Sequence, residues 1–133
     1  MENNRSKEDY LERFLILEER GIEKIRAKDI VCSFSYSRAS VSVAMKKLAE
    51  ENLIKIDENS YITLTEKGRD IASSVYKRHK MLTSFLMMIG VDEKQAREDA
   101  CKIEHDISEE TFSALNRFMK NKKIKKIADN LQN

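Results

Sequence analysis

The chain has 133 residues, 41% of them hydrophobic, which suits one compact domain or two small, closely packed ones. No apolar run approaches the roughly 20 residues of a membrane span, and the N-terminus lacks an apolar signal segment. We therefore expect a cytoplasmic protein in which Cys32 and Cys101 stay reduced. The net charge is only +2, which excludes a strongly basic chain, so any contact with nucleic acid must depend on local clusters.

The first half of the chain has the order of elements that is typical of a winged helix-turn-helix. Apolar periodicity predicts three helices, and a polar turn at residues 35–38 separates the second from the third. Two short strands follow, and Thr65 can cap the next helix, which continues to about residue 89. Gly21 and Gly90 each follow a helix, where a left-handed cap favours glycine. The first helices are predicted at residues 7–20, 27–32 and 38–52, and the strands lie within residues 53–64.

The second half of the chain is predicted to be helical. A long helix carries apolar residues spaced by three and four, with His79 among them, and Ser108 is expected to cap a sixth helix. The fifth helix is predicted at residues 93–106, with one apolar stripe. That stripe consists of Ala96, Ala100, Ile103 and Ile107, and the tail with Ile124, Ile127 and Leu131 could add another helix.

These patterns predict a mainly α fold with two domains. Residues 1–72 form an N-terminal winged helix-turn-helix, and residues 73–133 form an all-α metal-binding and dimerisation domain. Half-apolar helices need a partner to cover them, and a homodimer is the simplest arrangement.

The helix predicted at residues 38–52 is the candidate recognition helix, the element that a helix-turn-helix places in the major groove of double-stranded DNA. Arg38 can bond a guanine or a phosphate, and Val43 can touch a thymine methyl group. The alternative is that the serines only start the helix and face solvent. The predicted DNA-binding residues are Ser37, Arg38, Ala39, Ser40, Ser42, Val43, Lys46 and Lys47.

Three side chains that can bind a metal lie at positions i, i+3 and i+4: Cys101, Glu104 and His105. On a helix they share one face, within roughly a 100° arc. Thiolate, carboxylate and imidazole groups arranged in this way can hold a divalent transition ion. Taken alone, each has an ordinary structural explanation, such as a buried thiol or a satisfied core histidine. The predicted ligands, drawn from three helices, are Asp9, Glu12, His79, Cys101, Glu104 and His105.

Together these segments resemble the metal-dependent repressors of the diphtheria toxin repressor and manganese transport regulator type. The resemblance spans residues 6–119 and implies an N-terminal winged helix followed by a helical dimerisation domain. It further implies activation by Fe²⁺ or Mn²⁺ and binding to palindromic operators of metal-uptake genes. Some members carry a third, SH3-like domain, for which this chain is too short. The motifs that carry the resemblance are residues 8–12, 37–42, 64–68, 78–82 and 100–105.

The resemblance places the same six residues around the metal site or sites, but the set is a hybrid. Asp9 and Glu12 look like the manganese branch, which has a glutamate where this chain has Cys101. The cysteine looks like the iron branch, which has a methionine at the position of Asp9. The chain also departs from the iron branch at its ancillary site, because Thr83 and Arg97 stand where that branch has an acid and a histidine.

The expected function is a homodimeric transcriptional repressor of metal-homeostasis genes, activated by Fe²⁺, with Mn²⁺ as the second ion and Co²⁺ or Zn²⁺ as surrogates. One alternative is a manganese-responsive regulator of the same family. Another is a winged-helix regulator without metal, in which Cys101 senses oxidation. An enzyme with Cys101 as nucleophile and His105 as base is disfavoured, because both lie on one helix and no substrate loop is recognisable.

Overall fold

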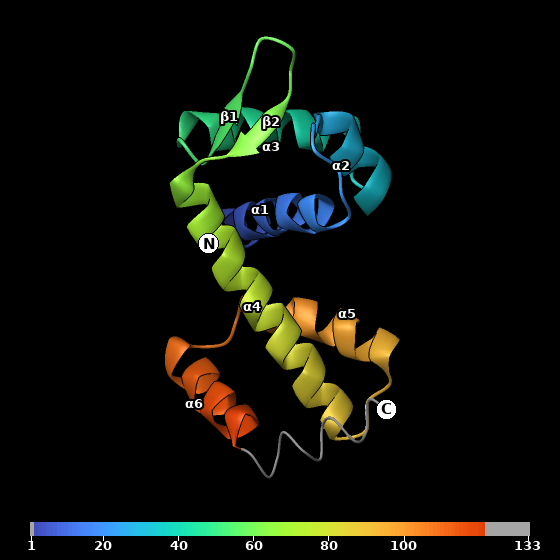
Figure 1. Ribbon diagram of the computed structural model, residues 1–133, viewed down its shortest axis with the longest axis vertical. Helices are drawn as coiled ribbons and strands as arrows, with labels where there is room; N and C mark the ends of the chain where they lie inside the picture. The colour runs from blue at the N-terminus through green and yellow to red at the C-terminus, as the bar shows by residue number, and fades with distance from the viewer. Residues whose placement is uncertain (1, 122–133) are drawn as a thin grey trace. The chain divides into compact units, whose positions relative to one another are not determined.

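The computed structural model describes residues 2–121, and the chain divides into two units, residues 1–74 and 75–133. The described residues form six helices and one antiparallel hairpin, which confirms the mainly α class (Figure 1). The predicted helix at Ile124, Ile127 and Leu131 lies outside the described residues. None of the described helices combines the length and the apolar character that crossing a bilayer requires. The elements are α1 Glu2–Glu19, α2 Ala27–Phe34, α3 Arg38–Glu50, β1 Ile54–Ile56, β2 Ile62–Leu64, α4 Glu66–Met88, α5 Glu93–Ile103 and α6 Glu109–Lys120.

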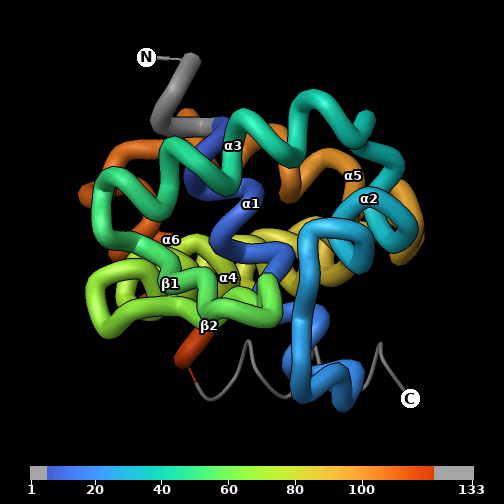
Figure 2. The backbone as a smooth tube through the Cα atoms, turned by 90° about the horizontal axis from the view of Figure 1, so that it is seen from above, coloured from blue at the N-terminus to red at the C-terminus, as the bar shows by residue number. Residues whose placement is uncertain are grey.

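The first unit contains α1, the helix-turn-helix of α2 and α3, the hairpin and the start of α4. The hairpin pairs Ile56 with Ile62, and the backbone N–H of Ile62 also donates to the carbonyl of Ile25 over 2.7 Å. Figure 2 shows the hairpin and α2 on either side of α1, with α3 running above them. The predicted winged helix-turn-helix order is therefore confirmed.

An apolar core fixes this arrangement. α1 buries residues spaced by three, and α3 and the hairpin cover them, so residues distant in sequence share one interior. The core consists of Tyr10, Leu11, Phe14, Leu17, Ile25, Ile30, Val41, Met45, Leu48, Leu53, Ile54, Ile62 and Ala72.

Short-range hydrogen bonds set the ends of the helices. Ser37 caps α3, because its hydroxyl accepts from the backbone N–H of Ser40 over 3.1 Å. Thr65 caps α4, as predicted, by accepting from the N–H of Gly68 over 3.0 Å. Gly21 and Gly90 have φ angles of 90° and 107°, which confirms the predicted left-handed caps.

The second unit contains the end of α4, together with α5 and α6. Asp92 caps α5, and Ser108 caps α6 by accepting from the N–H of Thr111 over 3.0 Å, which confirms the predicted Ser108 cap. The predicted stripe of α5 holds for Ala96 and Ala100 but is wrong for Ile103, which is exposed, because α5 ends at that residue. The buried apolar residues described in this unit are Val75, Leu82, Ala96 and Ala100.

Candidate metal centre and nucleic-acid interface

Glu104 is a buried carboxylate at the end of α5, with 1% of the residue exposed. The predicted helix at residues 93–106 is wrong at its end, since α5 stops at Ile103 and Glu104 is its cap. The chain then tightens into a turn in which the N–H groups of Asp106 and Ile107 both bond the carbonyl of Ile103. Glu104 and His105 therefore lie at a helix end rather than on a continuing helix face.

Two histidines flank the Glu104 carboxylate within the second unit. His79 Nδ1 lies 2.9 Å from Oε2, although 25 residues separate the two positions. His105 Nε2 lies 3.2 Å from Oε1, and its side chain is 2% exposed. α4 therefore contributes one imidazole and the α5–α6 turn contributes the carboxylate and the second imidazole.

The electrostatics of this cluster keep the carboxylate charged. Burial raises the pKa of Glu104, but hydrogen bonds from His105 and His79 and their positive charge outweigh burial and hold the pKa below its usual value. Apart from His105 Nε2 at 3.2 Å, no group in the described part of the chain bonds Oε1. A buried, ionised oxygen with bonding capacity left over, next to two imidazoles, is a donor set that fits a divalent transition ion.

The two predicted ligands in the first unit lie one turn apart on α1. Glu12 is fully buried, and its Oε1 accepts from Arg13 Nη1 over 3.0 Å. Asp9 is half-buried. A buried carboxylate needs a compensating charge, and Arg13 supplies one to Glu12, whose full burial is not that of a residue on a solvated helix flank.

Cys101, Thr83 and Arg97 occupy the other positions that the sequence compares with ligand sites. Cys101 is half-buried and, within residues 2–121, joins no group of three or more metal-competent side chains whose ligand atoms lie within 4.8 Å of one another. The hydroxyl of Thr83 donates to the carbonyl of His79 over 2.8 Å. Arg97 is exposed and pairs with Glu93 over 2.6 Å. Thr83 and Arg97 therefore provide no second set of ligands.

All eight predicted DNA-binding residues are exposed on α3 or at its cap. The hydroxyl of Ser37 is already used in capping the helix and in a 2.8 Å hydrogen bond to Ser40. Val43 is 64% exposed, an unusual position for a large apolar side chain. The exposed face thus combines hydroxyls, cations and one apolar contact, a combination suited to a DNA groove.

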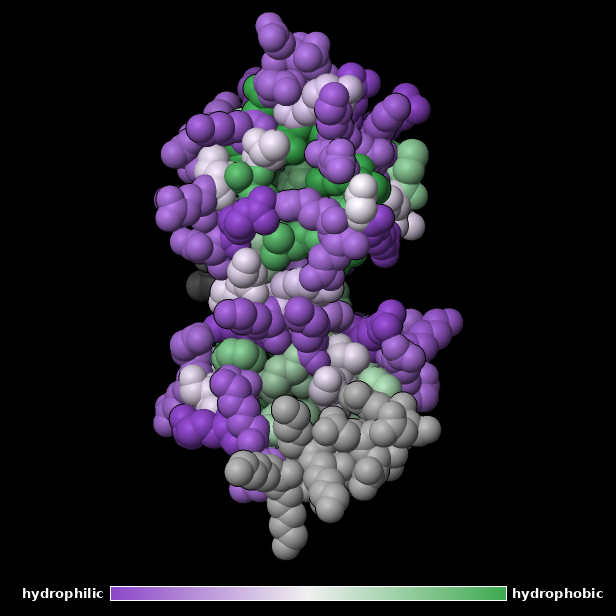
Figure 3. Space-filling view, viewed as in Figure 1, coloured by the Kyte–Doolittle hydropathy of each residue, from purple (hydrophilic) through white to green (hydrophobic). Residues whose placement is uncertain are grey.

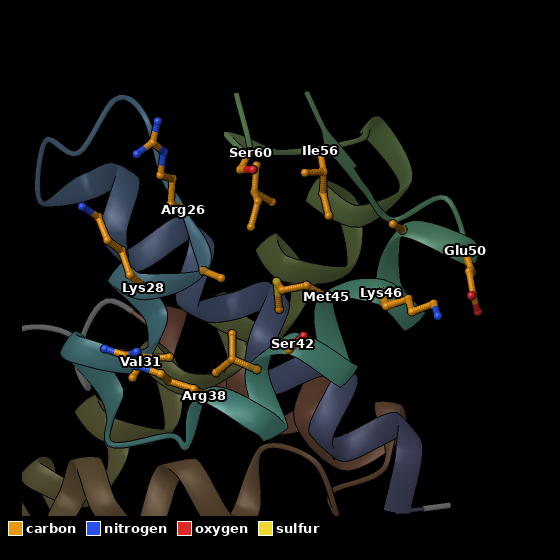
Figure 4. Close-up of a pocket in the computed structure, with 14 residues that line it drawn as sticks. Arg26, Lys28, Val31, Arg38, Ser42, Met45, Lys46, Glu50, Ile56 and Ser60 are labelled. Carbon is orange, nitrogen blue, oxygen red and sulfur yellow. The ribbon is translucent and has the colours of Figure 1, made fainter. Parts of the chain in front are cut away.

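A groove of about 950 Å³ lies between α2, α3 and the hairpin, with Met45 and Val31 among its apolar lining residues (Figure 4). Figure 3 shows hydrophobic residues in green among hydrophilic ones in purple on the visible face of the first unit. Four cations surround the groove, and two of them, Arg26 and Lys28, are absent from the sequence-based set. The four are Arg26, Lys28, Arg38 and Lys46.

Arg26 belongs to a basic cluster before α2. Its guanidinium lies 4.5 Å from the ring centroid of Tyr61 in the hairpin, and Lys24 Nζ lies 5.3 Å from the same ring. The signal in the sequence is the alternation of Lys24, Arg26 and Lys28 with apolar residues, which places two cations just ahead of α2 and the third in its first turn.

Comparisons with known proteins agree with this architecture. The family model "Iron dependent repressor, metal binding and dimerisation domain" matches residues 65–127. An uncharacterised HTH-type transcriptional regulator of Methanocaldococcus jannaschii is 34% identical over 123 residues, covering 92% of this chain and 98% of that protein. The HTH-type transcriptional regulator MntR of Geobacillus kaustophilus is 34% identical over 104 residues, covering 77% and 72%.

Among solved structures, that of the manganese regulator SloR is 37% identical and superimposes with a TM-score of 0.76 over 85% of this chain. The match covers 53% of SloR, so this chain spans about half of that protein's length. The fold and the matches define a helix-turn-helix transcriptional regulator with a metal-binding domain. The chain belongs to the diphtheria toxin repressor and manganese transport regulator family, whose members are repressors and not enzymes.

Proposed function

We propose that this chain acts in the cytoplasm as a homodimeric repressor of metal-homeostasis genes, and that it binds DNA when a divalent transition ion is bound. The observation that carries the proposal is the buried, ionised Glu104 between His79 and His105. A buried carboxylate is costly unless its charge is compensated, and a cation bound by the carboxylate and the two imidazoles would supply that compensation.

The proposed centre takes ligands from both units. His79, Glu104 and His105 are the ligands of the second unit, and Asp9 and Glu12 are those of α1. The ion supplies positive charge that relieves the repulsion among three carboxylates. These side chains would otherwise disfavour the docking of α1, so ion binding favours one geometry of the DNA-binding unit.

We favour Mn²⁺ and keep Fe²⁺ as the competing ion. The preference for Fe²⁺ depended on a thiolate ligand from Cys101. A ligand set of carboxylates and imidazoles suits Mn²⁺ and Fe²⁺ comparably. Adding a thiolate to that ligand set would make it less suitable for Mn²⁺. MntR and SloR, which resemble this chain, are named as a transcriptional regulator and as a manganese regulator, and the second name supports Mn²⁺.

The proposed DNA contact is α3 in the major groove, with the cations around the groove in Figure 4 on the phosphates. A symmetric dimer presents two such helices, so the operator is proposed to be palindromic, with its half-sites about one helical turn or a multiple apart.

The test is selection of bound sequences from a pool of random duplexes, run anaerobically with Mn²⁺, with Fe²⁺ and with chelator. We expect a palindrome to be enriched only when an ion is present. Glu104→Gln should abolish enrichment, because it replaces a charged ligand by a neutral amide of the same shape. Glu98→Gln, at an exposed position of α5, is the matched control and should behave like the wild type.

Two results would overturn the proposal. Equal enrichment with chelator and with metal means that DNA binding needs no ion. Normal enrichment by Glu104→Gln means that the buried carboxylate is not a ligand. Enrichment with one ion and not with the other decides between Mn²⁺ and Fe²⁺.

A further inference from the structure

We infer that Arg78 is a positioning residue for the metal centre, which acts by fixing the main chain of Glu104 while His79 contacts the side chain of the same residue. This inference rests on the proposed metal function. Arg78 Nη1 donates to the carbonyl of Glu104 over 3.3 Å, and His79 Nδ1 lies 2.9 Å from its Oε2. Two consecutive residues of α4 therefore hold the cap residue of α5 at two different points.

The main-chain contact matters because of where α5 ends. The last carbonyls of a helix lack partners within the helix, and those of a buried end need one from elsewhere. The carbonyls of Ala100 and Ile103 accept from N–H groups in the turn that follows them. The carbonyl of Glu104 accepts from Arg78 instead, so a side chain of α4 completes the end of α5.

The same guanidinium reaches a third segment. Its Nη2 lies 2.5 Å from Oε2 of Glu109 in the first turn of α6, and its central carbon lies 5.3 Å from the ring centroid of Phe112. In Figure 1, α5 and α6 flank the C-terminal half of α4. Arg78 thus bonds both ends of the turn that carries Glu104 and His105, a geometry that suits the planar fork of donors of a guanidinium.

Burial makes this contact specific. The side chain of Arg78 is 19% exposed, whereas that of Glu109 is 70% exposed. A solvated ion pair such as the one to Glu109 contributes little by itself, because water competes for both charges. The less exposed bond to the Glu104 carbonyl is the one expected to fix ligand geometry, as residues that orient metal ligands usually do.

The test measures Co²⁺ binding to the full chain by its visible absorption, which reports the symmetry of the ligands as well as affinity. We expect Arg78→Met to weaken Co²⁺ binding by roughly tenfold or more and to change the absorption bands. Arg97→Met removes one positive charge from an exposed site of the same unit and should leave both unchanged. A purely structural role would lower the stability of the apoprotein without altering the bands.

Two further variants separate the contacts of Arg78. Glu109→Gln removes the carboxylate partner and keeps the bond to Glu104, so we expect Co²⁺ affinity within about twofold of wild type. A loss as large as that of Arg78→Met would show that Arg78 acts through α6, which overturns the inference. Arg78→Lys replaces the guanidinium by one ammonium group, so it should also weaken Co²⁺ binding. If Arg78→Met fails to fold, the Co²⁺ affinity of Arg78→Lys tests the inference in its place.

Unchanged affinity and unchanged bands in the folded Arg78 variants overturn the inference and leave the proposed function standing. If the wild-type chain binds no Co²⁺, Mn²⁺ or Fe²⁺, the proposed function fails, and the inference fails with it.

Discussion

The two units bury different kinds of side chain. The first unit encloses large apolar residues such as Leu11, Phe14 and Ile30, each at most 1% exposed. In the second unit the largest fully buried side chain among the described residues is Glu104, a carboxylate. Several large apolar residues there stay exposed to solvent, namely Ile89, Ile103 and Phe118.

This contrast indicates different sources of stability. A fully buried large apolar side chain contributes about 1.5–3 kcal/mol, so the first unit is stabilised by its own core. Among the described residues of the second unit, the buried apolar ones are Val75, Leu82 and two small alanines, a core on which few domains of its size are stable alone. A bound ion and a second copy of the chain are the usual remedies for a small core.

The largest effect is expected from Gly68→Ala, which disrupts the first unit. A Cβ at Gly68 would overlap the carbonyl oxygen of Leu53 and lie 2.9 Å from its carbon, and both atoms belong to the backbone. Because neither can rotate away, the start of α4 must move from the hairpin, at a cost of about 3 kcal/mol. Hydrogen–deuterium exchange should show the loss in peptides from α3 and the hairpin.

Gly21→Ala is the control for this substitution. Gly21 has a φ of +90°, but a Cβ added there would meet no atom within 4 Å, so only backbone strain of about 1 kcal/mol is expected. Equal destabilisation by the two variants would mean that the contact between Gly68 and Leu53 is not limiting.

The first unit could be predicted well because its signals are local. Ser37 and Thr65 are caps, Gly21 follows a helix, and apolar residues recur with helical spacing. Each of these features is decided within about four residues, which is the range that sequence patterns describe. The close approach at Gly68 is the exception, because it depends on the backbone of Leu53, which directly precedes β1.

The centre of the second unit could be predicted only as a set of residue types. The pairing of His79 with Glu104 joins positions 25 residues apart, and no periodicity encodes it. The spacing i, i+3, i+4 places three side chains on one face only if the helix continues through His105, whereas α5 ends at Ile103 and a turn carries Glu104 and His105. The contact of Arg78 with Glu104 could not be predicted from the sequence, because one cation among many on an amphipathic helix has no pattern of its own.

The second prediction concerns removal of the ion. With free Mn²⁺ at a hundred times its dissociation constant, binding should stabilise the ligand-bearing segments by about 2.7 kcal/mol. Hydrogen–deuterium exchange should therefore become faster in peptides covering residues 98–107 when a chelator removes the Mn²⁺. The exchange of peptides from α2 and α3 should change little. Glu104→Gln should show no response to Mn²⁺. A uniform response across both units would contradict the separation of their stabilities.

The third prediction concerns the partner. If folding of the second unit is coupled to dimer formation, each tenfold dilution should lower its stability by about 1.4 kcal/mol. The first unit, with its own core, should not respond to dilution. Hydrogen–deuterium exchange measured at several protein concentrations, with the ion present, checks the predicted dependence on dilution. Concentration-independent exchange in α5 and α6 would mean that the exposed apolar residues are not covered by a second copy.

The smallest effect on stability is expected from Val43→Ser. Val43 is 64% exposed, so the substitution should change unfolding free energy by no more than about 0.5 kcal/mol. Val41, two residues away on the same helix, is 0% exposed, and Val41→Ser should cost about 2 kcal/mol or more because it buries a hydroxyl and loses apolar contact.

The two valines also separate stability from recognition. Val43→Ser should weaken binding to the selected duplex by about 1 kcal/mol, since an apolar contact to a thymine methyl is lost while the fold is kept. An unchanged affinity together with unchanged stability would mean that this side of α3 faces away from the bases. The recognition surface would then be confined to the cations around the groove, which position a protein on DNA without reading its sequence.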